Sequence, residues 1–468
     1  MVPFLKEGLL MTEQRQNALD YAHQSQEQFL TQLVALCKIP SISTDTEAKP
    51  AMQQAAQWIE NKLKSIGIHN VQIMPTGGHP IVYGEHLHAG DEAPTILVYG
   101  HYDVQPADPL ELWKSPPFEP TIMDGNLYAR GASDMKGQVM AGIFAIESIL
   151  HQGNLPVNIK FMIEGEEEVG SKNLGAFIET NADLLSCDLA LNPDGGILGA
   201  DKPSIPYALR GLAYFEIRVQ GPAGDLHSGM FGGAVLNPGN ELARLIAGMH
   251  DENGRVTLPG FYDSVLELSE KERTELARLP MDEEYYLNLT GAPTLYGEKG
   301  YSPVERVGGR PTLDVNGFLT GFTGEGSKTV LPAKAMAKIS MRLVANQDPA
   351  EVEKQLYQYL EENARPGITW KVLKHAGSPP SITPIDSEGV QAMAAGLEAV
   401  WGKKPLYYRV GGTIPVVGQM ESILGVDSVL TGFGLPDDNL HAPNEKLSLA
   451  PWYMGIDSLI HFFFNMEA

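Results

Sequence analysis

The early part of the chain alternates short apolar runs with longer stretches that carry apolar residues at helical spacing, and this alternation constrains the fold most. The runs 96–99 and 157–163 are typical of buried strands, whereas 26–37, 51–66 and 137–151 are expected to be helices. Strands that alternate with helices usually form βαβ units around a parallel sheet. We therefore predict an α/β fold with a mainly parallel central sheet flanked by helices.

The pattern changes after Pro206. Segments 213–220 and 335–344 alternate apolar and polar residues with the period of strands that have one exposed face, and helical stretches follow at 237–249 and 349–362. Strand-helix pairs of this kind indicate a small α+β domain with one antiparallel sheet and helices on one side.

Prolines at 379–384 mark the expected end of this second domain. The chain then returns to the first domain, which we expect to comprise residues 1–206 and 380–468, with residues 207–379 inserted into it. The segment 254–311 mixes helix and turn signals and has no clear assignment.

The charge balance excludes several kinds of partner. The chain has 34 Lys and Arg against 58 Asp and Glu. Its net charge of -24 would repel nucleic acid and an anionic membrane surface.

The N-terminal sequence lacks the apolar stretch of a secretory signal, so we expect a cytoplasmic protein. Cys37 and Cys187 are too few for a disulfide framework and are expected to be reduced structural thiols.

His101 and Asp103 directly follow the apolar run 96–99. Residues two apart in an extended segment point the same way, so a metal-binding imidazole at His101 could donate its second nitrogen to Asp103. The alternative is a purely structural histidine. Asp134 lies in a glycine-bounded turn before an expected helix, where it would be either an N-cap or a carboxylate that bridges two ions.

Acidic residues follow two further apolar runs. Four of them crowd the end of the strand 157–163, namely Glu164, Glu166, Glu167 and Glu168. Such crowding is costly in a buried place unless cations neutralise it, and a solvated acidic loop is the alternative. Two adjacent carboxylates could divide the work, one binding metal and one exchanging a proton with water. Asp194, which follows another apolar run, and His441, near the C-terminus, are the remaining candidate metal ligands.

Each of the five candidate ligands either follows a strand-like run or lies in a loop. Such positions are expected of a site at the carboxyl ends of parallel strands. They are His101, Asp134, Glu168, Asp194 and His441. With nitrogen and oxygen ligands and no cysteine, the set suits zinc, manganese or cobalt.

The ordered motifs resemble the di-zinc metallopeptidases that include aminoacylases, carboxypeptidases and carnosinase-like cytosolic nonspecific dipeptidases. The motifs are His-x-Asp at 101–103, Ala-Ser-Asp-Met-Lys-Gly at 132–137, Glu-Gly-x-Glu-Glu-x-Gly-Ser at 164–171, then Asp194 and the late His441. They span nearly the whole chain. The resemblance implies a metal-binding catalytic domain with an inserted lid and dimerisation domain, two divalent ions per subunit with zinc preferred, and a homodimer.

The resemblance also implies roles within the metal centre. His101 and Asp194 would bind one ion, Glu168 and His441 the other, and Asp134 would bridge them. Asp103 would orient His101, and Glu167 would act as the general base. The family's bridging aspartate precedes a cis peptide, so we expect one at Asp134-Met135.

In the inserted domain, the resemblance implies that His227 stabilises the oxyanion in the partner subunit's site. Arg342 would bind the substrate's terminal carboxylate through its bidentate fork, and Thr329 would form a hydrogen bond near it. Without the resemblance, we would expect Arg342 to be a solvent-facing strand residue. The sequence 408–415 resembles the family's substrate loop and contributes Gly411, Gly412 and Thr413. Many relatives have an acid where this chain has Val410.

The predicted activity is metal-dependent hydrolysis of dipeptides or other short peptides by a water that Glu167 activates. An N-acyl amino acid deacylase or carbamoyl amidohydrolase that uses the same centre is the first alternative. A non-catalytic dimeric scaffold is the second, and the presence of all five ligands together with Glu167 argues against it.

Overall fold

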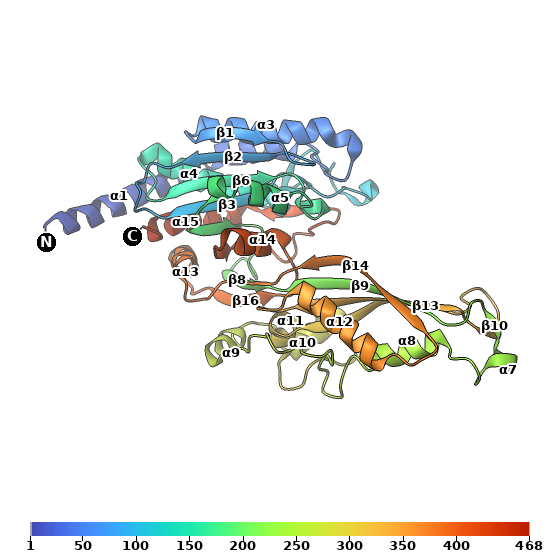
Figure 1. Cartoon of the computed structure of the whole chain (residues 1–468). Helices are drawn as coiled ribbons and strands as arrows, with labels where there is room; N and C mark the ends of the chain where they lie inside the picture. The colour runs from blue at the N-terminus through green and yellow to red at the C-terminus, as the bar shows by residue number, and fades with distance from the viewer. Residues whose placement is uncertain (1, 468) are drawn as a thin grey trace. The chain divides into compact units, whose positions relative to one another are not determined.

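The computed structural model describes residues 2–467, with side chains described from residue 12 onward, and the chain forms two compact units (Figure 1). The first unit contains the chain up to Tyr207, then Thr383–Tyr407, and the chain from Gln419 onward. The second unit contains Ala208–Ile382 and Tyr408–Gly418. The expected boundaries near 206 and 380 lie close to these. Residues 408–418, however, belong to the second unit and not to the first, which corrects the predicted division.

The first unit is built on a six-stranded sheet. In spatial order its strands are β1 (His69–Met74), β2 (Ile81–His86), β6 (Asn158–Glu164), β3 (Thr95–His101), β7 (Leu189–Asn192) and β17 (Ser428–Leu430). From β6 to β17 neighbouring strands are parallel, whereas β1 and β2 pair antiparallel at one edge. β6 and β7 are buried along their whole length, as expected for parallel strands covered on both faces. The predicted mainly parallel sheet is confirmed.

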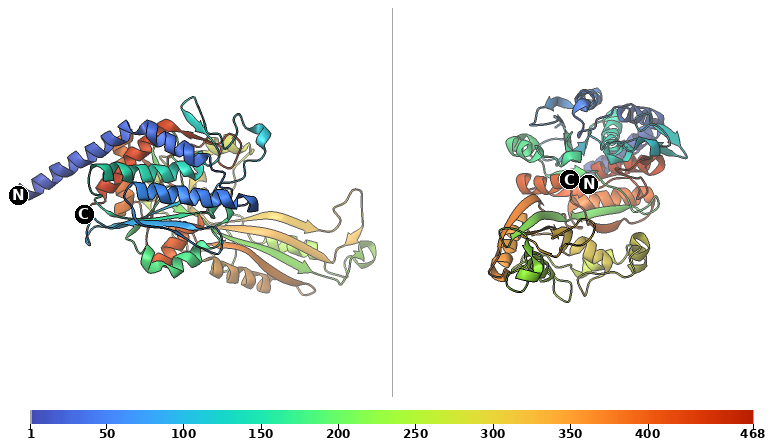
Figure 2. Two further views of the ribbon diagram at one scale, coloured as in Figure 1. Left: turned by 90° about the horizontal axis from the view of Figure 1, so that it is seen from above. Right: turned by 90° about the vertical axis from the view of Figure 1, so that its right-hand side faces the viewer.

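Helices pack around this sheet. They are α1 (Val2–Gln24), α2 (Gln26–Cys37), α3 (Lys49–Ser65), α4 (Gly137–Gln152), α5 (Leu174–Thr180), α6 (Ala182–Leu185), α13 (Glu388–Trp401) and α15 (Leu449–Asn465). α3 packs on β1 and β2, α4 on β3, and α4 also contacts α1 and α15 (Figure 2). Gly100 permits the close approach of β3 to α4, since a Cβ there would lie 2.5 Å from the Val139 side chain.

The chain also forms two three-stranded sheets. In one, β18 (Lys446–Ser448) pairs with β5 (Asn126–Tyr128), which pairs with β4 (Thr121–Met123), and this brings the C-terminal segment beside the loop that follows residue 128. In the other, the order is β15 (Ser381–Ile382), β8 (Ser204–Leu209) and β16 (Leu406–Val410). Helix α14 (Pro415–Leu424) follows. The chain passes from one unit to the other within β8, at the end of β15, within β16 and within α14.

The second unit has a four-stranded antiparallel sheet, as the alternating patterns predicted. Its order is β11 (Thr312–Thr320), β13 (Lys334–Leu343), β9 (Gly211–Gln220) and β14 (Thr369–Ser378). Alternate residues of β9 and β13, such as Phe215 and Ile339, are buried against α8 (Pro238–Ala247) and α12 (Pro349–Asn363).

The remaining elements of the second unit are short. They are β10 (Leu226–His227), α7 (Ser228–Phe231), α9 (Glu270–Leu276), α10 (Glu283–Thr290), α11 (Pro303–Gly309) and β12 (Val330–Leu331). The segment 254–311, which had no sequence-based assignment, therefore supplies α9 to α11. Cys37 and Cys187 are both free thiols. Among the described residues, no helix is both long and apolar enough to cross a bilayer.

Candidate metal centre

His101 is the last residue of β3, and its ring is fully buried. Nδ1 lies 3.0 Å from the main-chain oxygen of Asp103. Because a carbonyl oxygen can only accept a hydrogen bond, Nδ1 carries the proton, and in the neutral ring Nε2 has the free lone pair. Asp103 therefore fixes the tautomer through its backbone, while its carboxylate Oδ1 lies 3.3 Å from the same nitrogen.

The Nε2 atom of His101 faces carboxylates and makes no hydrogen bond to any described residue. It lies 3.3 Å from Asp134 Oδ1 and 4.0 Å from Asp194 Oδ1. Burial opposes protonation, but these carboxylates and Asp103 outweigh it and raise the pKa of His101 well above its usual value. A lone pair that faces carboxylate oxygens requires a cation between them, and a metal ion meets that requirement as well as a proton does.

Asp134 lies between the two histidines. Its Oδ1 faces His101, and its Oδ2 is 3.0 Å from Nε2 of His441. Burial favours its neutral form, yet the two imidazoles hold its pKa below the usual range. Asp134 is not an N-cap, because α4 begins at Gly137 after a stretch in which Asp134 has non-helical dihedral angles. The Asp134-Met135 peptide is cis, as the resemblance implied.

Glu167 and Glu168 form a short helical turn just after β6. Their backbone N–H groups donate to the Asp103 carboxylate, over 3.3 Å and 3.1 Å. Glu168 Oε2 is 3.3 Å from His441 Nε2 and accepts a hydrogen bond from Gln105 over 2.8 Å. The Glu168 side chain is only 2% exposed, so the alternative of a solvated acidic loop does not hold for it. Asp103 thus holds both the His101 ring and the Glu167-Glu168 turn in place.

The acids of the site are held close together away from water. Burial, aided by neighbouring carboxylates although opposed by His101, raises the pKa of Glu167 to about 8 and that of Asp194 to about 7. Asp194 follows β7, and its backbone N–H donates to Asn192 Oδ1 over 2.9 Å. Such crowding destabilises the chain unless positive charge is present among the carboxylates.

His441 comes from a C-terminal loop and has a left-handed backbone, with φ of 60°. Its side chain is 55% exposed. Hydrogen bonds to Asp134 and Glu168 raise its pKa to about 10, although partial burial opposes this. The open side of the site therefore carries one imidazole whose Nε2 faces two carboxylates.

The site fits divalent metal ions by its own geometry. Ligand atoms of His101, Asp134 and Glu168 lie within 4.8 Å of one another. Asp194 Oδ1 lies 4.0 Å from His101 Nε2, and His441 Nε2 lies 3.0 Å from Asp134 Oδ2 and 3.3 Å from Glu168 Oε2. Asp134 presents one oxygen to each histidine, as a bridging ligand would. All five predicted ligands are therefore brought together, and they come from five separate segments of the chain.

Glu445 is a buried residue of this site that the sequence did not reveal as functional. Its carboxylate accepts hydrogen bonds from the backbone N–H groups of Gly131, Ser133 and Asp134, over 2.9 to 3.1 Å, and forms an ion pair of 2.7 Å with Arg130. Glu445 thereby holds the loop that presents Asp134. The only sequence signal was an acid four residues after His441, which does not indicate a partner more than 300 residues away.

Glu164 also differs from a solvated acid, because it is almost fully buried at the end of β6. It accepts hydrogen bonds from the hydroxyls of Tyr99, over 2.8 Å, and Ser171, over 2.9 Å. Burial and the Asp103 charge raise the pKa of Glu164 to about 8, against the effect of these hydroxyls. It supports the strand end behind the ligands.

In the second unit, Arg342 lies on the sheet face away from the core of that unit. Its Nη1 donates to Thr413 Oγ1 over 3.0 Å. Arg210, which the sequence analysis missed, donates through Nε to the Gly411 oxygen over 3.0 Å and through its backbone N–H to the Gly412 oxygen over 3.1 Å. Burial and the charge of Arg342 lower the pKa of Arg210 to about 10. Neither guanidinium forms an ion pair with a described carboxylate, so together they provide positive charge for an anion.

His227 and Thr329 lie in a different part of the second unit. His227 pairs with Val330 in the ribbon of β10 and β12, and the Ser228 N–H donates to the Thr329 oxygen over 3.1 Å. Along β13, eight residues separate Arg342 from the end nearest this ribbon, about 27 Å at strand spacing. Within one chain, the predicted partners Thr329 and Arg342 are therefore not brought together.

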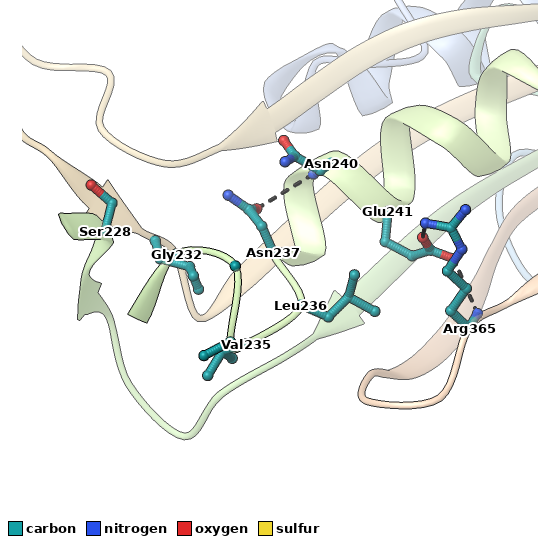
Figure 3. A pocket seen from close by; sticks show the side chains of 11 residues that line it. Ser228, Gly232, Val235, Leu236, Asn237, Asn240, Glu241 and Arg365 are labelled. Atoms are coloured by element: carbon teal, nitrogen blue, oxygen red, sulfur yellow. Dashed lines mark hydrogen bonds and ion pairs between the residues drawn. The ribbon is translucent and has the colours of Figure 1, made fainter. Parts of the chain in front are cut away.

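A pocket in the second unit lies beside the segment that follows His227 (Figure 3). Its charged groups are already satisfied, since Glu241 accepts a 3.0 Å hydrogen bond from the Arg365 backbone N–H. Asn237 Oδ1 likewise accepts from Gly239 and Asn240 at the start of α8. None of the predicted site residues lines this pocket.

Comparison with known proteins points to one family. The profile of Peptidase family M20/M25/M40 matches residues 97–465. The chain is 31% identical to Cys-Gly metallodipeptidase DUG1 of Candida albicans, with 96% of this chain and 97% of the relative covered. It is 34% identical to human Beta-Ala-His dipeptidase, with 83% and 77% covered. Among solved structures, an M20 family metallo-carboxypeptidase, Sso-CP2 from Sulfolobus solfataricus, matches with a TM-score of 0.80 and 37% identity, covering 94% of this chain and 99% of that one.

Proposed function

The chain belongs to the M20/M25/M40 peptidase family, and from that premise we propose that it hydrolyses dipeptides at a centre of two divalent ions. The family assignment agrees with the resemblance drawn from the sequence motifs. The observation that carries the proposal is the placement of Asp134, with one oxygen toward His101 and the other toward His441. His101 and Asp194 would hold one ion, and Glu168 and His441 the other.

Glu167 would perform the proton transfers. Its carboxylate makes no hydrogen bond to another described residue, and its backbone is fixed by Asp103. A carboxylate at this position can accept a proton from the attacking water and then deliver it to the leaving amine. When bound, divalent ions polarise a scissile carbonyl and make water more acidic. Glu164 and Glu445 would keep the strand end and the Asp134 loop in place.

We propose zinc as the preferred ion, with manganese and cobalt as alternatives. The ligands are two imidazoles and three carboxylates, and no thiol lies among them. This donor set binds several first-row metals, so the metal that is available decides much of the occupancy. Metal analysis of protein purified without added metal, combined with reactivation of the stripped protein by each ion, tests the assignment.

The substrate's terminal carboxylate would be bound by Arg342, Thr413 and the Gly411-Gly412 backbone, joined by Arg210. Arg342 and Arg210 supply two cationic groups without an internal ion pair, which suits an anionic group of a small ligand. The Thr329 assignment rests on the resemblance alone, because Thr329 lies at the other end of the sheet.

We also propose that the active form is a homodimer in which each subunit lends His227 to its partner. His227 Nδ1 accepts a 3.0 Å hydrogen bond from the Gly229 N–H, so the neutral ring carries its proton on Nε2 and can donate to an oxyanion. The distance of about 27 Å along β13 places His227 too far from Arg342 for both to contact one dipeptide within a chain.

An N-acyl amino acid deacylase is the second candidate, and Val410 favours it. The resemblance implies an acid at this position in many members of the family, whereas the aliphatic side chain of Val410 cannot pair with a free amino group. A carbamoyl amidohydrolase would use the same centre. These activities share the carboxylate-binding residues with a dipeptidase and differ in the group on the other side of the scissile bond.

A substrate panel separates these candidates. We expect Ala-Ala and Cys-Gly to be cleaved, N-acetyl-Ala to be cleaved poorly, and Ala-Ala amide to react about 10 to 100 times more slowly than Ala-Ala, because a charged hydrogen bond contributes about 1.5–3 kcal/mol. Cleavage of N-acetyl-Ala in preference to dipeptides would establish the deacylase. Equal turnover of the acid and the amide would contradict the role of Arg342.

A further inference from the structure

A second group of metal-ligating side chains lies at the antiparallel edge of the six-stranded sheet. His69 begins β1, His86 ends β2, and His88 follows two residues later. The rings of His86 and His88 are 4.7 Å apart between centroids, and those of His69 and His88 are 5.0 Å apart. One nitrogen of each ring lies within 4.8 Å of those of the other two. We refer to these three residues as the histidine triad.

His86 is already arranged as a metal ligand. Its Nδ1 lies 3.4 Å from the carbonyl oxygen of Gly67, which can only accept, so the neutral ring has its lone pair on Nε2. That Nε2 atom is buried and makes no hydrogen bond to a described residue. Histidine ligands commonly donate the second ring nitrogen to a backbone carbonyl in this way. Burial, and to a smaller degree the two neighbouring imidazoles, lower the pKa of His86 and favour the neutral ring.

The other two imidazoles can complete the coordination by small movements. At a Zn–N distance of about 2.0–2.1 Å, tetrahedral ligands lie about 3.3 Å from one another. The triad nitrogens therefore need to approach by about 1.5 Å at most. His69 and His88 are exposed, whereas His86 is 8% exposed and provides the fixed ligand.

The histidine triad is separate from the catalytic centre. His86 pairs with Ile159 near the start of β6, whereas His101 pairs with Glu164 at its end. Five residues of strand correspond to about 17 Å. Because the triad contains imidazoles only, it selects ions such as zinc, nickel or copper over magnesium or calcium, which prefer oxygen ligands.

We propose that His69, His86 and His88 bind one divalent transition-metal ion, with zinc as the physiological candidate, and that this ion fastens β1 to β2 at the edge of the sheet. Three protein ligands leave a fourth position for water. The catalytic centre does not depend on this ion, because none of its ligands comes from β1 or β2.

The test measures the zinc bound to tag-free, full-length holoenzyme in equilibrium dialysis against micromolar free zinc, so that a readily exchanging ion is still counted. The double variant His69→Gln/His88→Gln leaves the buried His86 in place and should fold normally. We expect it to contain one zinc equivalent less than the unmodified chain and to keep its peptidase activity. This difference of one is independent of how many ions the catalytic centre holds, so it stands even if the proposed function fails.

A matched control removes two imidazoles elsewhere. The variant His23→Gln/His375→Gln loses side chains that pair with Asp457 and Glu216, and it should keep the full zinc content. Copper bound to the chain with an occupied catalytic centre should show the spectroscopic signature of several nitrogen ligands, and the triad variant should lose it. Equal zinc in the unmodified chain and the triad variant, or equal loss in the control, would overturn the proposal.

Discussion

The catalytic centre and the histidine triad lie at opposite ends of the same sheet and differ in how their ligands are held. In the centre, Asp103 fixes His101 and the Glu167-Glu168 turn, while Glu445 fixes the loop of Asp134. In the triad only His86 is buried, and its partners are exposed. The centre is therefore preorganised around charge, whereas the triad must gather its ligands when an ion arrives.

This difference has consequences for chemistry. Preorganised carboxylates and imidazoles can hold an ion in one geometry while a substrate binds and reacts. Exposed imidazoles lose side-chain freedom on binding, which weakens affinity. We therefore expect the centre to retain its ions through dialysis and the triad to exchange its ion readily.

Replacement of Glu167 by Gln tests the chemical side of the comparison and should have the largest effect. The amide cannot accept a proton, so kcat should fall by about 10² to 10⁴, the usual contribution of general acid–base catalysis. Metal content at both sites should stay unchanged, because Glu167 is not among the ligands. Steady-state kinetics and metal analysis measure these quantities. Undiminished turnover would refute the mechanism.

Replacement of Glu445 by Gln tests preorganisation. The Asp134 loop would lose part of its hydrogen bonding and the Arg130 ion pair, so metal affinity at the centre should fall by about 10- to 100-fold, as for other residues that support ligands. Competition with a chelator, followed by activity, measures this affinity. The exposed Glu179→Gln serves as the control and should behave as the unmodified chain. Equal metal affinities in the two variants would show that the Asp134 loop keeps its conformation without the Glu445 carboxylate.

Sequence reasoning located the catalytic ligands because their places follow general rules. His101 ends β3, and Asp194 comes two residues after β7, so both lie at the carboxyl ends of parallel strands, where such sites form. Asp134 and His441 lie in loops, where residue type and position allowed them to be candidates, and the order of the motifs supported their place in the same site.

The missed features depend on pairings between distant segments. Glu445 reaches Asp134 because β18 pairs with β5, and the sequence does not reveal this pairing. The triad exists because β1 and β2 pair with His69 opposite Glu85, which brings the end of one strand beside the start of the other. Neither strand was assigned from its sequence. Segment 408–418 was misplaced because connectivity alone does not show which unit a loop packs against.

Zinc-dependent thermal stability gives the smallest expected effect and sharpens the comparison at the edge of the sheet. An ion that binds only the folded chain at 100 times its Kd contributes about 2.7 kcal/mol. If it fastens β1 to β2, zinc added to enzyme whose catalytic centre is already occupied should raise the Tm by a few degrees. His69→Gln/His88→Gln should abolish this rise, and His23→Gln/His375→Gln should keep it. A rise that persists in the triad variant would show that the added zinc stabilises the chain at some other place, and the edge of the sheet would then need no ion.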